Sequence, residues 1–308
     1  LVQGELAVNV TDKRLYTENN AGAIVELGTN PSTIDINAGT VDGITSLSTS
    51  TSGTSNFIAG VNAGNSITSG GNFNVLVGDE AGTAITTGDN NVAVGYAALD
   101  ANTTGTSNIA VGQSALSNNT TGGSLVSVGN DALLANTTGD YNVGIGYQSL
   151  KSNTTGDKNV AVGYQSLKSN TTADYNTAFG DQALESNTTG TRNTAVGALA
   201  LDANTTTSFN TAIGYLSLSA NTSGASNVAV GDSALGLSTS GDNCTALGQA
   251  ALAANTSGNS NTAVGRGALI ANTTASNNTA VGYDAGKTNT TGARLTSVGA
   301  RSGMQNTT

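Results

Sequence analysis

Glycine recurs at an interval of seventeen residues from Gly78 to Gly299, without an insertion or a deletion. A fixed period of this length is typical of repeat proteins, in which each repeat follows the same backbone path and stacks on the one before it. The period argues against an ordinary globular enzyme and predicts a rod. The series is Gly78, Gly95, Gly112, Gly129, Gly146, Gly163, Gly180, Gly197, Gly214, Gly231, Gly248, Gly265, Gly282 and Gly299.

One repeat, residues 159–175, reads N-V-A-V-G-Y-Q-S-L-K-S-N-T-T-A-D-Y, and its residues are numbered here as positions 1 to 17. Position 2 is mostly Val or Thr, position 3 is small, position 4 is apolar and position 5 is the glycine. This pattern predicts a short strand that has one face inward and ends at the glycine. Glycine at that point indicates a positive φ angle or a close approach of two backbones at a corner.

The second half of each repeat carries one large apolar residue. Position 9 is Leu from Leu99 to Leu269, next to Ala or Ser at position 8, and Gly replaces it at Gly82, Gly286 and Gly303. A βαβ unit needs roughly 30 residues, so a repeat of this length has room only for two short strands and two turns. We therefore predict an all-β fold, a parallel β-roll or β-solenoid with 17-residue coils, in which a looser coil around Gly60 caps the array.

Polar residues are equally periodic. Position 12 is Asn from Asn102 to Asn306 except at Ser238, and position 13 is Thr throughout. Position 1 is Asn except at Leu125, Cys244 and Leu295. Stacked Asn and Thr side chains form hydrogen-bonded ladders along such an axis. With only the position-4 and position-9 residues expected inside, a single chain has a thin core, so we expect a homotrimer in which neighbouring chains cover a second face rich in Ala and Ser.

Composition excludes several classes of function. The net charge is −10 and the 10 basic residues are scattered, which argues against nucleic-acid binding. No apolar run of membrane-spanning length is present, so membrane insertion is not expected. Histidine is absent and Cys244 is the single cysteine, which excludes an ordinary zinc site and an intrachain disulfide. Cys244 replaces an Asn of the repeat, and we interpret it as a tolerated small residue rather than a reactive thiol.

Carboxylates and tyrosines are the candidate functional groups. A glycosidase needs two carboxylates at a set separation. Asp recurs at position 16 (Asp89, Asp140, Asp157, Asp174 and Asp242) and at position 6 (Asp79, Asp181 and Asp232) as one choice among polar turn residues. We interpret these residues as turn residues rather than catalytic or Ca²⁺-binding groups, and expect no enzyme activity, metal or cofactor. The candidate surface-binding residues share position 6: Tyr96, Tyr147, Tyr164, Tyr215 and Tyr283.

The repeat N-x-A-V-G-x-x-A/S-L resembles the head repeat of trimeric autotransporter adhesins, over residues 56–308. That resemblance implies a left-handed parallel β-roll wound as a trimer. The present repeat differs by an additional N-T-T-G corner, which makes its coil longer.

The first thirty residues have a second resemblance. G-E-L-A-V-N at residues 4–9, Asp12, L-Y at residues 15–16 and I-V-E-L-G at residues 24–28 are similar to a small β module of phage tail fibres and receptor-binding proteins. The segment is interpreted as three short strands with turns at residues 12–13 and 19–22. The predicted organisation is an attachment and trimerisation module over residues 1–30, an extended intertwined linker over residues 31–55 and the rod over residues 56–308.

These resemblances imply a phage tail fibre, a structural protein of the virion with a role in host attachment. Its partners would be other copies of the chain, tail or baseplate proteins, and a glycan or protein of the host surface. A bacterial trimeric surface adhesin is the alternative. A tailspike depolymerase and an ice-binding solenoid are less favoured, because no carboxylate pair is distinguished and the Thr residues of position 13 fall at a corner.

Overall fold

The computed structural model describes residues 6–9, 14–18, 24–26, 52–304 and 307, and the chain divides into two compact units, Leu1–Leu47 and Ser48–Thr308. The first unit contains β1 (Leu6–Asn9), β2 (Arg14–Glu18) and β3 (Ile24–Glu26), paired antiparallel in the order β1-β2-β3. The prediction of three short strands is confirmed. Its two turns and most of the predicted linker (residues 31–51) lie outside the described residues.

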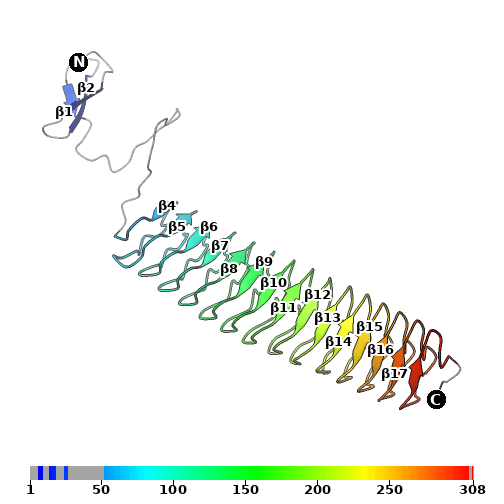
Figure 1. Ribbon diagram of the computed structural model, residues 1–308. Helices are drawn as coiled ribbons and strands as arrows, with labels where there is room; N and C mark the ends of the chain where they lie inside the picture. Colours follow the sequence, from blue (N-terminus) through cyan, green and yellow to red (C-terminus); the bar gives the residue numbers. More distant parts are fainter. Residues whose placement is uncertain (1–5, 10–13, 19–23, 27–51, 305–306, 308) are drawn as a thin grey trace. The chain divides into compact units, whose positions relative to one another are not determined.

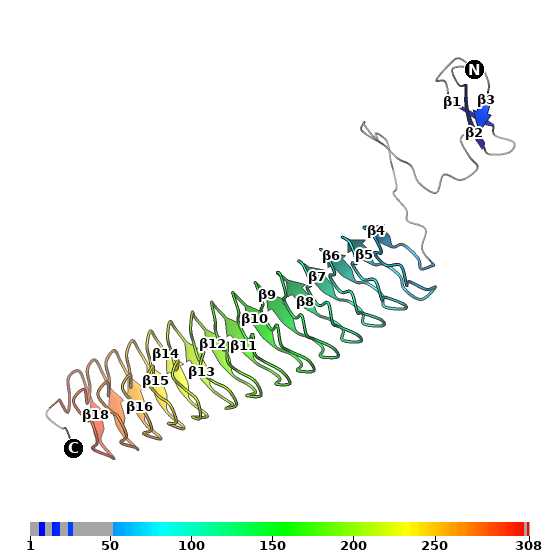
Figure 2. The same ribbon diagram turned by 180° about the vertical axis from the view of Figure 1, so that it is seen from behind.

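The second unit is a β-solenoid in which each coil contributes one strand to a single parallel sheet of 15 strands, β4 to β18 in sequence order (Figures 1 and 2). The coil around Gly60 belongs to this sheet, because β4 pairs with β5 in parallel register. The solenoid with 17-residue coils is therefore as predicted. The strands are β4 (Phe57–Ala59), β5 (Val75–Val77), β6 (Val92–Val94), β7 (Ile109–Val111), β8 (Val126–Val128), β9 (Val143–Ile145), β10 (Val160–Val162), β11 (Thr177–Phe179), β12 (Thr194–Val196), β13 (Thr211–Ile213), β14 (Val228–Val230), β15 (Thr245–Leu247), β16 (Thr262–Val264), β17 (Thr279–Val281) and β18 (Thr296–Val298).

The expectation of two strands per coil is wrong for the described coils, since only positions 2 to 4 form a strand. The rest of the coil consists of turns, because positions 7, 9 and 17 adopt left-handed backbone conformations. In one coil these are Gln165, Leu167 and Tyr175, with φ of 51°, 49° and 60°. A left-handed residue reverses the chain direction and cannot continue a strand. It also explains the three Gly substitutions at position 9, where φ is again near 60°.

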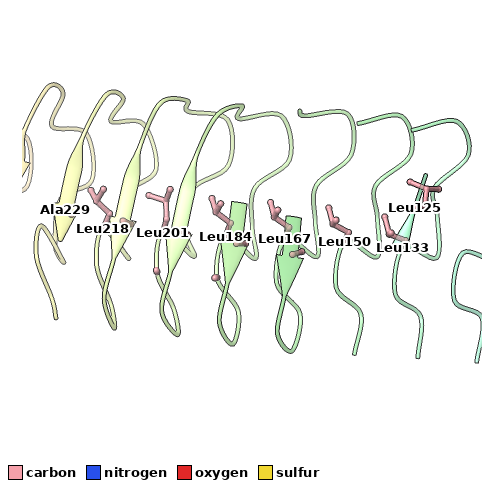
Figure 3. Close-up of a cluster of buried hydrophobic side chains, with 14 of the residues drawn as sticks. Leu125, Leu133, Leu150, Leu167, Leu184, Leu201, Leu218 and Ala229 are labelled. Atoms are coloured by element: carbon pink, nitrogen blue, oxygen red, sulfur yellow. The ribbon is translucent and has the colours of Figure 1, made fainter. Parts of the chain in front are cut away.

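The interior of the rod is narrower than the sequence pattern suggested. Position 3 is buried, and with it positions 8 and 9, as in Ala161, Ser166 and Leu167 of one coil. Figure 3 shows Leu150, Leu167, Leu184, Leu201 and Leu218 in a row, one to each coil. The position-4 residues, expected inside, lie on the outer side of the sheet, where Phe179 is 57% exposed. The Ala- and Ser-rich face that we assigned to chain–chain contact is therefore the interior, because its small side chains are those that fit between the walls of one coil.

Asparagine and threonine ladders hold successive coils together. The Asn153 side-chain NH₂ donates to Asn136 Oδ1 and to the Gly156 carbonyl, each at 2.9 Å, and Asn153 Oδ1 accepts from Asn170 at 2.9 Å. The Thr154 hydroxyl donates to the Thr171 carbonyl at 3.0 Å, and the Thr154 backbone N–H donates to the same oxygen at 2.8 Å. The predicted ladders of positions 12 and 13 are thus confirmed, and they satisfy polar groups that are fully buried at position 12.

Candidate functional site

The outer side of the sheet, here called the strand face, is formed by the side chains of positions 2 and 4. None of these side chains is charged between Val75 and Val298. They are half-buried or exposed on every strand from β5 to β18, with Phe179 as the most prominent in the middle of the rod. Position 4 is apolar on each of these strands and position 2 is Val, Ile or Thr. An uncharged, largely apolar surface that runs along an acidic chain is the kind of surface that proteins use for association.

Two rows of side chains border the strand face. The N-edge row consists of the position-17 residues, which lie two residues before each strand, and the C-edge row consists of the position-6 residues, which lie two residues after it. Every aromatic residue between residues 52 and 304 belongs to the strand face or to one of these rows. The aromatic side chains of this part of the rod therefore lie on the strand face or along one of its two edges.

The five predicted tyrosines all lie in the C-edge row and are between 40% and 54% exposed. The structure brings Tyr147 and Tyr164 together as a stacked pair, with ring centroids 5.5 Å apart and planes 11° apart. Tyr283 lies between the guanidinium groups of Arg266 and Arg301, each 5.6 Å from its ring. A hydrogen bond with Glu80 raises the pKa of Tyr96. The tyrosines are accessible, but only two of them form an aromatic pair.

The N-edge row was missed by sequence reasoning. On five successive coils it carries Tyr141, Lys158, Tyr175, Arg192 and Phe209, so that aromatic rings alternate with cations. The Lys158 ammonium lies 5.1 Å from the Tyr175 ring, and Arg192 lies 5.5 Å from the Tyr175 ring and 5.6 Å from the Phe209 ring. The contact with the Tyr175 hydroxyl, at 3.2 Å, also raises the pKa of Lys158. The signal is present in the sequence, because the residues of position 17 compared across successive repeats show this alternation of aromatic and basic side chains.

No protein-family model, curated protein or solved structure matches this chain. Its function is therefore inferred from the geometry of the strand face and its two rows.

The position-16 carboxylates are structural. Asp140 Oδ1 accepts the backbone N–H of Gly123, Asp157 accepts that of Asp140 and Asp174 accepts that of Asp157, each at 2.7 Å. Asn259, Ser208 and Ser276 accept the equivalent N–H where they occupy this position. Where a side-chain oxygen is present at this corner, as in these residues, it satisfies a backbone N–H of the preceding coil. Within the described residues, no three His, Cys, Asp or Glu side chains are grouped in a way that would bind a metal.

Cys244 lies inside the rod in the place of a position-1 Asn. Its thiol donates to the Gly258 carbonyl at 3.2 Å, whereas Asn227 uses its amide for the equivalent bond to Gly241. Burial raises the pKa of the Cys244 thiol, which disfavours the reactive thiolate. These observations support its interpretation as a tolerated substitution.

A shallow apolar depression of about 340 Å³ lies on the turn segment of the coils, away from the strand face. It forms where Gly236 leaves space at position 10. Its lining includes Leu216, Leu237 and Ile270 but no charged residue.

Among the residues that the structure describes, no helix has the length and apolar character of a membrane span.

Ionised Asp202 lowers the stability of the folded rod. Its Oδ1 is buried without a hydrogen-bond partner, and burial, followed by the charge of Glu185, raises the pKa of this carboxyl. A raised folded-state pKa means that ionised Asp202 destabilises the fold, and that this penalty disappears as the pH falls below the unfolded-state pKa of about 3.9. We expect Asp202→Asn to raise the thermal midpoint at pH 7 and to leave it unchanged at pH 3. Melting curves at both pH values test this, with Asp232→Asn, at an exposed position, as the control for the loss of one charge.

Proposed function

We propose that this chain is a structural, non-enzymatic segment of a phage tail fibre, a homotrimeric rigid rod that serves attachment to the host surface. Its place would be the virion, outside the cell. The observation that carries the proposal is the uncharged strand face, which continues along the rod from β5 to β18. In a homotrimer the strand faces of three chains would pack around a common axis, and the rods would be stiffer than one thin chain.

The size of the strand face is sufficient for such an interface. From β5 to β18 there are thirteen steps between strands, which at about 4.8 Å each give a length of about 60 Å. The six residue steps from the N-edge row to the C-edge row span about 20 Å at about 3.3 Å per residue. The product is about 1,200 Å² on each chain. Divided between the two neighbours in a trimer, it gives about 600 Å² per chain at each interface, or about 1,200 Å² per pair, which is the lower end of the range of roughly 1,200–2,000 Å² for stable interfaces.

The N-terminal unit supports the assignment to a tail fibre through its resemblance to tail-fibre modules. In that assignment residues 1–30 bind tail or baseplate proteins, and the rod presents a host-binding surface or carries one further along the fibre. The A-V-G repeat of the rod also favours the alternative, a bacterial trimeric surface adhesin.

The assembly is tested by sedimentation of the purified 308-residue chain. We expect a trimer whose association depends on the strand face. Val196→Lys, on the outer side of β12, should shift the population towards monomers, because it places a charge in an apolar contact. Thr189→Lys, on an exposed corner of the preceding coil, is the matched control and should leave the trimer intact. A wild-type chain that stays monomeric at micromolar concentration would contradict the proposed trimer.

The location is tested by immunogold electron microscopy with antibodies against the rod. Labelling along the tail fibres of phage particles from a culture that carries the gene is the expected result. Labelling of bacterial envelopes without labelling of virions would instead support the adhesin.

A further inference from the structure

We infer that Asp181 of one chain forms an ion pair with Lys158 and Arg192 of a second copy of this chain, at a seam where the N-edge row of one strand face meets the C-edge row of the next. This inference rests on the proposed homotrimer and names the residues that join its subunits. Two observations lead to it, an exposed carboxylate without a partner among the described residues and the order of residues along the two rows, and the geometry of a closed ring connects them.

The carboxylate of Asp181 has no hydrogen bond or ion pair among the described residues, although its side chain is exposed two residues after β11. Lys158 and Arg192 lie two residues before β10 and β12, at the other end of the strands, and are exposed as well. Their separation from Asp181 within one chain is about 20 Å, six residue steps at about 3.3 Å. The three charges cannot pair within one chain.

A closed ring of identical chains brings the two rows together. When the three strand faces surround an axis parallel to the rod, the N-edge row of each chain lies next to the C-edge row of the neighbouring chain. Rotation about such an axis includes no shift along it. Each strand therefore lies at the same height along the axis as the same strand of the next chain, and residues at the same height are here called level. Asp181 then lies level with Tyr175 of its neighbour, because these two residues border β11 on its two sides.

The order of residues in the two rows fits this level pairing. Tyr175 is the ring between the two cations, so a carboxylate level with it lies between Lys158 one coil before and Arg192 one coil after. Ala198 of the C-edge row leaves space level with the long Arg192 side chain. Aromatic residues are level with each other on both sides of this segment, as Tyr147 with Tyr141 and Tyr215 with Phe209.

Charge also distinguishes this arrangement from other packings of a periodic rod. The C-edge row has acidic residues at Asp79, Asp181 and Asp232, but only Asp181 is flanked by cations of the facing row. In an antiparallel pair that placed two N-edge rows together, Lys158 and Arg192 would face no carboxylate of the other row, because position 17 carries no acidic residue from Phe73 to Arg294. The strand face is so uniform that it discriminates weakly among such alternatives, and unequal charges supply the discrimination that apolar contacts lack.

A disulfide tests the level pairing directly. After oxidation of the native protein, Asp181→Cys combined with Tyr175→Cys in one chain should give covalent dimers and trimers on a denaturing, non-reducing gel, whereas either single variant should not. The matched control combines Asp181→Cys with Ser226→Cys, which lies three coils from Tyr175, about 14 Å along the axis and beyond the reach of a disulfide. The buried Cys244 is retained in every variant.

A charge exchange tests the ion pair. Asp181→Lys should weaken trimer association at least about tenfold, because three cations then meet at the seam. Asp232→Lys, in the same row but level with Ser226, should change it less than about threefold. Combining Asp181→Lys with Lys158→Asp and Arg192→Asp should restore association. A stable trimer that gives no cross-link, or that ignores Asp181→Lys, would overturn the seam and leave the trimeric fibre standing, whereas a wild-type monomer would contradict both.

Discussion

Gly146→Ala should destabilise the rod by at least about 3 kcal/mol, although it adds a single methyl group. Gly146 has φ of +129°, a region that residues with a side chain rarely adopt. A Cβ atom there would meet the carbonyl oxygen of Gly163, in the next coil, at only 2.4 Å. Neither the strain nor the clash can be relieved locally, because the neighbouring atoms are backbone atoms held in the ladder.

The same substitution two residues earlier is the control. Gly144 lies inside β9, at position 3, where most coils carry Ala. Its added Cβ would meet the side chains of Ser149 and Leu133 at 3.1 and 3.2 Å, and Ala161 coexists with Ser166 in the following coil. We expect Gly144→Ala to change the free energy of unfolding by no more than about 1 kcal/mol. Urea denaturation measures the free energy of unfolding of both variants. Equal losses for Gly146→Ala and Gly144→Ala would contradict the argument that the backbone at position 5 requires glycine.

Asn153→Ser should cost about 2–4 kcal/mol of folding free energy. The shorter side chain cannot reach Asn136 Oδ1, the Gly156 carbonyl and the Asn170 amide together, so buried partners of Asn153 lose their hydrogen bonds. Each buried polar group left without a partner costs about 1–3 kcal/mol, and Asn136, Asn153 and Asn170 are fully buried. The effect should be absent for substitutions of exposed Thr residues in the same corner.

The reverse substitution at the equivalent place gives a test of opposite sign. Ser238 interrupts the position-12 ladder between Asn221 and Asn255, and its hydroxyl is buried without a hydrogen-bond partner. Ser238→Asn should therefore stabilise the rod by about 1 kcal/mol, since it would continue the ladder. If both variants destabilised the rod, continuity of the amide ladder would not account for the effect.

Much of the rod could be predicted because each feature is repeated. The short strand before each glycine, the Asn and Thr ladders and the buried Leu row all follow from residue types that recur at one interval, and the exposed tyrosines were found in the same way. The trimer, the virion location and the host-attachment role stay predictions. The N-edge row was missed because residues as different as Lys158, Tyr175 and Arg192 share a position without sharing a residue type.

The sequence by itself determined the period, the short strand before each glycine and the polar corners, because these depend on local residue preferences. The second strand that we expected in each coil is replaced by turns in the described coils. The sequence did not determine which side of the strand faces inward. The V-A-V pattern is compatible with a strand that turns either its Val side chains or its Ala side chain inward. Hydrophobicity alone favours the Val side chains, which in the structure lie outside. Only stacking decides this, since the walls of a 17-residue coil enclose room for an Ala and one Leu, and the larger Val, Ile and Phe side chains remain outside. The surface on which the proposed function depends is thus a consequence of the limited volume inside the coil.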